Sequence, residues 1–172
     1  MGVRNVLVEG VSGTGKTSVA TELQRRGLHV VHGDRTLAHQ GDPVTGEPTA
    51  GFRHEHHVWP VAEVRRLAAD RTHPWTFFCG GSRNHARFLD VFDAVVVLTV
   101  DAGTLQRRLA SRAGTDEWGA TQEQRDLSRR LHATQEDVPR AGTRVDATRP
   151  LGEVVDDVLR AAGIDPALHP AR

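Results

Sequence analysis

The feature that most constrains this chain is a glycine-rich loop near its start. Residues 8–20 read VEGVSGTGKTSVA, and Gly10, Gly15, Lys16 and Thr17 fit the spacing G-x-x-x-x-G-K-S/T. Glycines let such a loop curl so that its N–H groups point at phosphate oxygens, and the helix that follows adds its positive dipole end. The motif therefore predicts a strand before the loop and a helix after it.

Both neighbouring segments meet this requirement. Residues 5–10, NVLVEG, form a short apolar run that ends in glycine. After the loop, Val19, Ala20 and Leu23 follow helical spacing. The loop is predicted to hold nucleotide phosphates, with the Thr17 hydroxyl offered to Mg²⁺. The predicted nucleotide-binding residues of the loop are Gly10, Ser12, Gly13, Thr14, Gly15, Lys16, Thr17 and Ser18.

Lysine occurs once in the chain, as Lys16, against 21 arginines. Arginine carries a broad planar fork, whereas a lysine side chain is slim enough to thread along the loop to the β- and γ-phosphates. GTP-binding switch proteins typically read guanine with an Asn/Thr-Lys-x-Asp segment, which needs a second lysine. A GTPase of that kind is therefore nearly excluded.

Composition narrows the class of protein further. The length suits a single domain over residues 1–172, and the formal net charge of zero leaves no basic field for nucleic acid. No segment approaches the roughly 20 apolar residues of a membrane span, and one cysteine, Cys79, fits a reducing compartment. We expect a cytoplasmic monomer or homodimer with a small-molecule partner and no nucleic-acid or membrane partner.

Apolar runs and helical patterns alternate along the rest of the chain. Four further strands are expected, at residues 28–34, 74–81, 93–101 and 143–147. Helices are expected at residues 58–69, 84–92, 102–112, 122–138 and 151–162. This alternation predicts an α/β fold in which helices wrap a five-stranded parallel sheet. Between these elements, residues 38–52 read as a long functional loop and residues 112–122 as a short lid.

The chain resembles the small P-loop kinases of nucleosides and nucleotides, which include adenylate-kinase-like and shikimate-kinase-like enzymes. Besides the phosphate loop, the segments LTVDAGTLQRRLASRAG (98–114) and RVDATRPLGEVVDDVL (144–159) carry the resemblance. It implies a three-layer P-loop NTPase sandwich and a lid arginine that closes on the phosphates. Arg112 matches that arginine best, and Arg108 lies one turn earlier on the same face. The loop expected to contact adenine contains Ala147, Thr148 and Arg149.

The resemblance implies a kinase that moves the γ-phosphate of MgATP to a small acceptor, with nucleosides or nucleotides favoured. Lys16, Mg²⁺ and the lid arginines would neutralise charge during the transfer. A shikimate-, gluconate- or antibiotic-type kinase is one alternative, and a nucleotide-binding regulator or sensor without transfer is another. The sensor gains weight because no clear Walker B aspartate ends the third strand. If the protein is a kinase, Asp34 or Asp101 must supply the missing carboxylate.

The acceptor is expected where the second and third strands end. Asp34 is a candidate to take or orient a hydroxyl proton, or to bind Mg²⁺ through water, and otherwise is a turn residue. Glycines after the third strand would let an acceptor approach the backbone, and the resemblance to shikimate kinases adds an arginine. The predicted acceptor-binding residues are Asp34, Arg53, Trp59, Gly80, Gly81 and Arg83.

A histidine cluster lies in RHEHHVW, residues 53–59. His54 and His57, at i and i+3 of a helix, would be able to share a metal ion. No third ligand has a predictable geometry, so the favoured interpretation is that the cluster lines the acceptor pocket or caps a helix.

Overall fold

A five-stranded parallel sheet forms the centre of the computed structural model, which describes residues 4–112 and 118–171. Every strand pairs in parallel with its neighbour, as the alternation of apolar runs and helical patterns predicts. Across the sheet the strands are β2 (His29–His32), β5 (Trp75–Cys79), β1 (Arg4–Glu9), β6 (Ala94–Thr99) and β7 (Thr143–Asp146).

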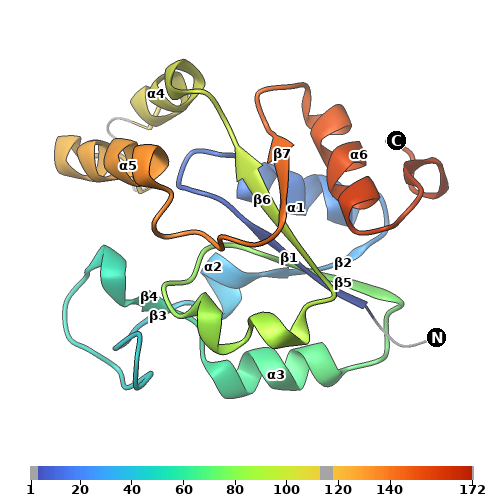
Figure 1. Cartoon of the computed structure of the whole chain (residues 1–172), viewed down its shortest axis with the longest axis horizontal. Coiled ribbons are helices and arrows are strands. Elements are labelled where there is room, and N and C mark those ends of the chain that lie inside the picture. Colours follow the sequence, from blue (N-terminus) through green and yellow to red (C-terminus); the bar gives the residue numbers. More distant parts are fainter. Residues whose placement is uncertain (1–3, 113–117, 172) are drawn as a thin grey trace.

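Helices cover both faces of the sheet, which confirms the predicted α/β layers (Figure 1). One face carries α1 and α6, and the other carries α3. The helices are α1 (Lys16–Arg25), α2 (Gly33–Thr36), α3 (Val61–Ala69), α4 (Ala102–Ala110), α5 (Gln122–Thr134) and α6 (Leu151–Ala161). Short 3₁₀ turns lie at His54–His56, His85–Arg87, Leu89–Val91 and Pro166–Leu168.

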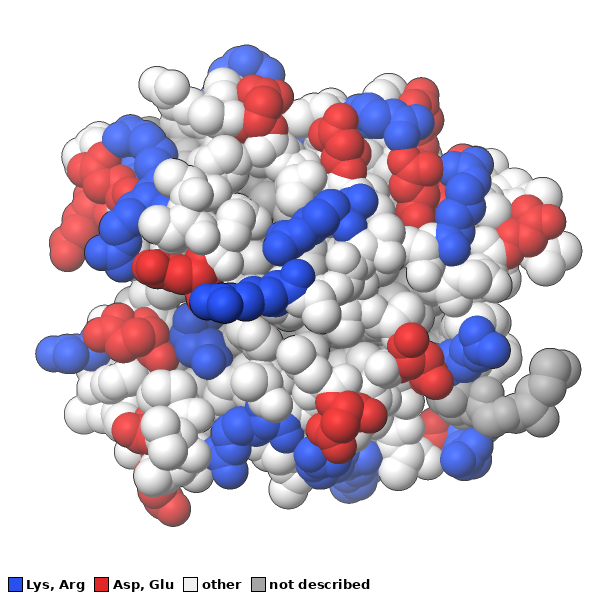
Figure 2. All heavy atoms as spheres, in the orientation of Figure 1, with Lys and Arg blue, Asp and Glu red and all other residues white. Residues whose placement is uncertain are grey.

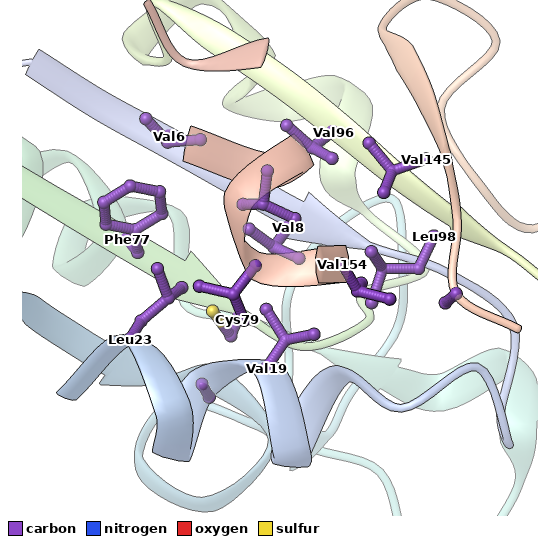
Figure 3. Close-up of a cluster of buried hydrophobic side chains, with 14 of the residues drawn as sticks. Val6, Val8, Val19, Leu23, Phe77, Cys79, Val96, Leu98, Val145 and Val154 are labelled. Atoms are coloured by element: carbon purple, nitrogen blue, oxygen red, sulfur yellow. The ribbon is translucent and has the colours of Figure 1, made fainter. Parts of the chain in front are cut away.

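The central strands are buried on both faces. On one face, Val8 and Val96 pack against Val19 of α1, in the cluster shown in Figure 3. On the other face, Leu7 belongs to a cluster that contains Trp59. Strands buried on both faces read as continuous apolar runs, as residues 94–98 of β6 do.

The second strand is shorter than predicted. It ends at His32, and Asp34 lies in the short helix α2 that follows. Gly33 packs so closely on the indole of Trp59 that a Cβ there would lie 2.0 Å from Cζ2. No side chain therefore fits at position 33, where the second strand has ended and α2 begins.

The helix predicted at residues 84–92 is absent, and two 3₁₀ turns take its place. The Asn84 side chain accepts from the backbone N–H of Trp59 and donates to its carbonyl oxygen. Phe88 is fully buried and stacks on Trp59 at 5.8 Å between ring centroids. These tertiary contacts outweigh the helical pattern.

The segment predicted as a long loop forms most of a small hairpin. β3 (His39–Gln40) pairs antiparallel with β4 (His57–Val58), and Gly41 forms an isolated bridge with Pro48. Of the lid predicted at residues 112–122, residues 113–117 lie outside the described residues. Among the helices of the described residues, none has the length and apolar character needed to cross a membrane.

A buried ion pair joins α1 to α6, and we expect it to stabilise the fold. Glu22 accepts from Arg25 and Arg26, and Arg26 also donates to Asp156 of α6 at 2.5 Å. The Arg25 hydrogen bonds, opposed by burial and helped by Arg26, lower the pKa of Glu22 to about 2. A carboxylate with a depressed pKa stabilises the fold above its unfolded value of 4.5 and loses that effect as pH falls toward 2.

We therefore expect Glu22→Gln to lower the free energy of unfolding by about 2 kcal/mol at pH 7. Urea titrations at several pH values should show the difference from wild type shrinking below pH 4.5. The matched control is Glu63→Gln, which breaks the exposed pair with Arg66 and should change little. A loss at Glu22 that is the same at pH 7 and pH 3 would contradict the charge explanation.

Candidate active site

The phosphate loop lies between β1 and α1, as predicted. Gly10 approaches the chain closely, because a Cβ there would lie 2.5 Å from Thr14 Oγ1 and 2.9 Å from the Leu98 carbonyl oxygen. Gly13 and Gly15 have φ values of 92° and 100°, a left-handed region that favours glycine. The glycines of the motif are thus required by the shape of the loop.

Lys16 is the first residue of α1, and its side chain folds back over the loop. Its Nζ donates to the carbonyl oxygen of Gly10 at 2.6 Å and lies 3.4 Å from that of Val11. The next residue, Thr17, is exposed, and its hydroxyl makes no hydrogen bond to the described residues. The loop and the start of α1 therefore present the Lys16 ammonium group and the Thr17 hydroxyl beside the N–H groups of the loop.

A cavity of about 480 Å³ lies on one side of the loop and is called the nucleotide cavity below. Its walls come from the loop, the ends of α1 and α4, and the segment that joins β7 to α6. Several apolar side chains line the α6 side, and arginines line the α4 side. The lining residues are Gly13, Thr14, Gly15, Ser18, Val19, Arg108, Ser111, Arg112, Ala147, Arg149, Leu151 and Val154.

Arg108 and Arg112 both reach the phosphate loop. Arg108 donates to the carbonyl oxygens of Gly13 and Thr14 at 3.3 and 3.1 Å, and to that of Ala147 at 2.8 Å. Arg112 lies just beyond the end of α4 and donates to Ser12 Oγ at 3.2 Å. The structure thus brings together both arginines that the resemblance suggested.

The segment expected to contact adenine is only partly placed as predicted. Arg149 lines the nucleotide cavity, but its guanidinium is paired with Glu153 and Asp157 of α6. Thr148 does not line the cavity, and its hydroxyl donates to Asp146 at 2.6 Å. Ala147 lines the cavity directly, so the backbone and this methyl group face the ligand space there.

A second cavity of about 210 Å³, called the acceptor cavity below, lies on the other side of the loop. Lys16 lines this cavity, not the first one, so the phosphate loop separates the two spaces. The lining residues are Gly10, Ser12, Lys16, Asp34, Phe52, His54, His57, Gly81, Arg83, Trp118 and Asp137.

Asp34 is held at the edge of the acceptor cavity by two groups. Its Oδ1 accepts from the Gly81 N–H at 2.9 Å and lies 3.1 Å from His57 Nε2. Burial raises the pKa of Asp34, but the His57 hydrogen bond and the Lys16 charge outweigh it, so the pKa is lower than usual. Oδ2 makes no hydrogen bond to the described residues, which leaves a charged oxygen available for a ligand.

A second polar group in this cavity was missed by the sequence analysis. Asp137 lies 2.5 Å from Arg83 Nη1 and 3.4 Å from His54 Nε2. The Arg83 and Asp137 side chains are only 11% and 7% exposed. Burial raises the pKa of Asp137, but the His54 hydrogen bond and the Arg83 charge together outweigh this effect, so the pKa is lower than usual. This carboxyl is therefore ionised at neutral pH.

Aromatic rings form the rest of the cavity wall. Trp118 lies 5.5 Å from Phe52 and 5.4 Å from His54 between ring centroids. Phe52 is 64% exposed, so a large apolar face is open at this edge of the cavity.

Three residues predicted to bind the acceptor lie elsewhere. Trp59 is a core residue, 1% exposed, because its indole fills the space beside Gly33 and Gly80. Arg53 does not line the cavity, and its guanidinium lies 3.5 Å from the Glu55 carboxylate at the surface. Gly80 lies beneath Asp34, where a Cβ would come within 2.8 Å of Oδ1, so it supports the site without lining it.

Other carboxylates near the strand ends have structural partners. Asp101 caps α4 by accepting from the N–H and hydroxyl of Thr104, and it lines neither cavity. Glu9 is buried behind the loop and accepts from the N–H groups of Gly10 and Ser82. Burial raises the pKa of Glu9 despite the nearby charges of Arg83 and Lys16. Glu9 was not predicted as part of the site. The signal that would have pointed to it is its position directly before Gly10, the first glycine of the phosphate loop.

The histidines at residues 54–57 have separate partners. His54 lies beside Asp137, His57 beside Asp34, and His56 beside Thr49. Within residues 4–112 and 118–171, no group of three His, Cys, Asp or Glu side chains converges as a metal site. His54 and His57 line the acceptor cavity, as the favoured interpretation of the cluster predicts.

Comparison with known proteins identifies a family for this chain. Residues 6–130 match the model of the AAA_18 family, described as an AAA domain. No curated protein sequence matches the chain.

Solved structures of three kinases share the fold. A sugar kinase from Janibacter sp. HTCC2649 is 22% identical, with 96% of this chain and 98% of that chain covered and a TM-score of 0.61. A gluconokinase from Sinorhizobium meliloti 1021 is 21% identical, with coverages of 93% and 91% and a TM-score of 0.58. A shikimate kinase from Bacteroides thetaiotaomicron is 13% identical, with coverages of 94% and 99% and a TM-score of 0.58. The fold predicted from the sequence is thus confirmed.

Proposed function

This chain belongs to the AAA_18 family, and from that premise we propose that it is a kinase that transfers the γ-phosphate of MgATP to a small molecule. The observation that carries the proposal is the pair of cavities that share one phosphate loop. One space suits a nucleotide, and the other holds a carboxylate where an acceptor hydroxyl would meet the terminal phosphate. The kinase names of the structural neighbours support the same reaction class.

ATP would lie with its base in the nucleotide cavity, near Leu151 and Val154, and with its phosphates along the loop. Because Lys16 lines the other cavity, the terminal phosphate would lie at the boundary between the two spaces. Arg108 and Arg112 would exchange their bonds to the loop for bonds to phosphate oxygens, which neutralises charge in the transition state.

The metal that belongs to this proposal is Mg²⁺. Thr17 Oγ1 and Asp34 Oδ2 make no hydrogen bonds to the described residues, and hard oxygen donors of this kind fit Mg²⁺. Held by these residues, Mg²⁺ would help to neutralise the negative charge of the phosphates during the transfer. A cytoplasmic location and a monomeric or homodimeric state complete the proposal.

As the alternative to holding the metal, Asp34 would orient the acceptor hydroxyl and receive its proton. Its lowered pKa keeps it ionised at neutral pH, and the Gly81 N–H and His57 hold one oxygen while the other is unpaired. The proposed acceptor is a nucleoside or nucleotide in the first place. The alternative is a sugar-, gluconate-, shikimate- or antibiotic-type hydroxyl compound.

A nucleotide-binding sensor is the second candidate, favoured by one observation. β5 ends at Cys79 and is followed by Gly80 and Gly81, so neither the strand nor the turn after it supplies a carboxylate to face the phosphate loop. A sensor would bind MgATP without forming a phosphorylated product.

Incubation with MgATP and a panel of acceptors separates the two candidates. The panel contains nucleosides, nucleoside monophosphates, neutral sugars, gluconate, shikimate and aminoglycosides. A kinase releases ADP at least about tenfold faster with its acceptor than without, because an acceptor completes the site. Mass spectrometry should show the acceptor heavier by one phosphoryl group. Tight MgATP binding with no phosphorylated product from the panel would favour the sensor.

A further inference from the structure

The charge of the acceptor cavity determines what can enter it. Two cations, Lys16 and Arg83, and two carboxylates, Asp34 and Asp137, line the space. When a triphosphate occupies the loop, Lys16 is committed to it. Arg83 then faces two ionised carboxylates and the added negative charge of the nucleotide.

Arg83 is itself already neutralised. Its Nη1 lies 2.5 Å from Asp137 Oδ2, and both side chains are nearly buried. Turning Arg83 toward an anionic ligand would leave the Asp137 carboxylate buried without its main partner, which is unfavourable. An arginine in this position therefore does not provide the free cation that recognition of a carboxylate or phosphate requires.

The remaining walls suit an uncharged ring. Phe52 and Trp118 present aromatic faces, which pack against a nucleobase or against the C–H face of a sugar. The carboxylates and histidines offer hydrogen-bond partners for hydroxyl groups, which both donate and accept. On the face that Figure 2 shows, side chains of both signs are present, and blue and red groups lie next to one another at several places.

We propose that the acceptor is an uncharged polyhydroxyl compound, a nucleoside or a neutral sugar, and that the Arg83–Asp137 pair excludes acids and monophosphates. This inference rests on the proposed kinase function and selects among its acceptor classes. Exclusion follows because an anion gains no unpaired cation in the cavity and is repelled by Asp34, Asp137 and the nucleotide phosphates.

The first test measures anion binding without any turnover. The nucleotide cavity is filled with Mg²⁺ and a non-hydrolysable ATP analogue, and sulfate binding is measured by calorimetry. Asp137→Asn should bind sulfate at least about tenfold more tightly than wild type, because it frees Arg83 at almost unchanged shape. The matched control Arg83→Gln/Asp137→Asn, which removes both charges, should return sulfate binding to the weak wild-type level.

Wild-type protein that binds sulfate as tightly as Asp137→Asn would overturn the inference. Circular dichroism and thermal melting establish that each variant folds. If Asp137→Asn does not fold, wild type is compared with the double variant. Equal and weak sulfate binding by those two proteins supports the inference, and tighter binding by wild type overturns it.

The second test compares matched pairs of acceptors. Adenosine is paired with its 5′-monophosphate, glucose with gluconate, and methyl shikimate with shikimate. In the pair that the enzyme uses as acceptors, the uncharged member should have a kcat/KM at least about tenfold higher than the anionic member. Asp137→Asn should reduce this ratio of kcat/KM values. The pair that reacts distinguishes a nucleoside from a sugar. Preference for an anionic member would overturn the inference but leave the kinase function in place. No product from any pair would count against the kinase function. In that case sulfate binding decides the inference.

Discussion

Lys16→Ala is expected to lower ATP-dependent turnover by about 10²- to 10³-fold while the fold stays intact. Lys16 is the only lysine, and its Nζ lies within 2.6 Å of the loop carbonyl of Gly10, where the terminal phosphates would bind. No other ammonium group is available in the sequence to replace it. Turnover is measured as ADP release, and nucleotide affinity by calorimetry.

Lys16→Arg is the matched control, because it keeps the charge and changes only the shape of the side chain. The glycine turns of the loop leave a narrow path, so the planar guanidinium should rescue little of the activity. Thermal melting should show both variants folded. Wild-type nucleotide affinity and turnover in Lys16→Ala would mean that the loop does not hold a nucleotide phosphate.

Asp34→Asn should reduce phosphoryl transfer by about 10²- to 10⁴-fold, the range for loss of a general base. The substitution keeps the shape of the side chain but removes the charged oxygen that faces the acceptor cavity. Affinity for MgATP separates two roles for Asp34. If Asp34 faces the acceptor, Asp34→Asn should leave the affinity for MgATP unchanged. If Asp34 holds Mg²⁺, the substitution should weaken that affinity.

Asp70→Asn is the matched control for Asp34. Asp70 is a turn aspartate that accepts from Thr72 and lines neither cavity, so its replacement should leave turnover unchanged. Normal transfer by Asp34→Asn would return Asp34 to the role of a turn residue. The search for the base would then move to Asp137, the other carboxylate that lines the acceptor cavity.

The acceptor cavity was the part of the site least accessible from sequence. Trp59 was expected there, yet it lies in the core and Trp118 takes the aromatic position. Asp137 had no motif around it, since it follows α5 and reaches Arg83 only because the chain returns across the strand ends. Nothing local in the sequence distinguishes the two tryptophans or marks this carboxylate.

The sequence by itself determined the phosphate loop and the parallel sheet. A phosphate loop is built from consecutive residues, Gly10 to Thr17, whose backbone geometry follows from the glycines themselves. The sheet follows from apolar runs that only burial on both faces explains. These features depend on local pattern, so the spacing of residue types was enough to predict them.

Only the tertiary structure decided the charge and walls of the acceptor cavity. The pairing of Arg83 with Asp137 joins residues far apart in the chain, and Asp34 is held by the distant residues Gly81 and His57. Both arrangements depend on packing between helices, strands and loops that are distant in the sequence. This packing decides which of the many arginines and aspartates of the chain are buried together. A cavity formed by distant segments therefore carries its specificity in contacts that no local spacing encodes.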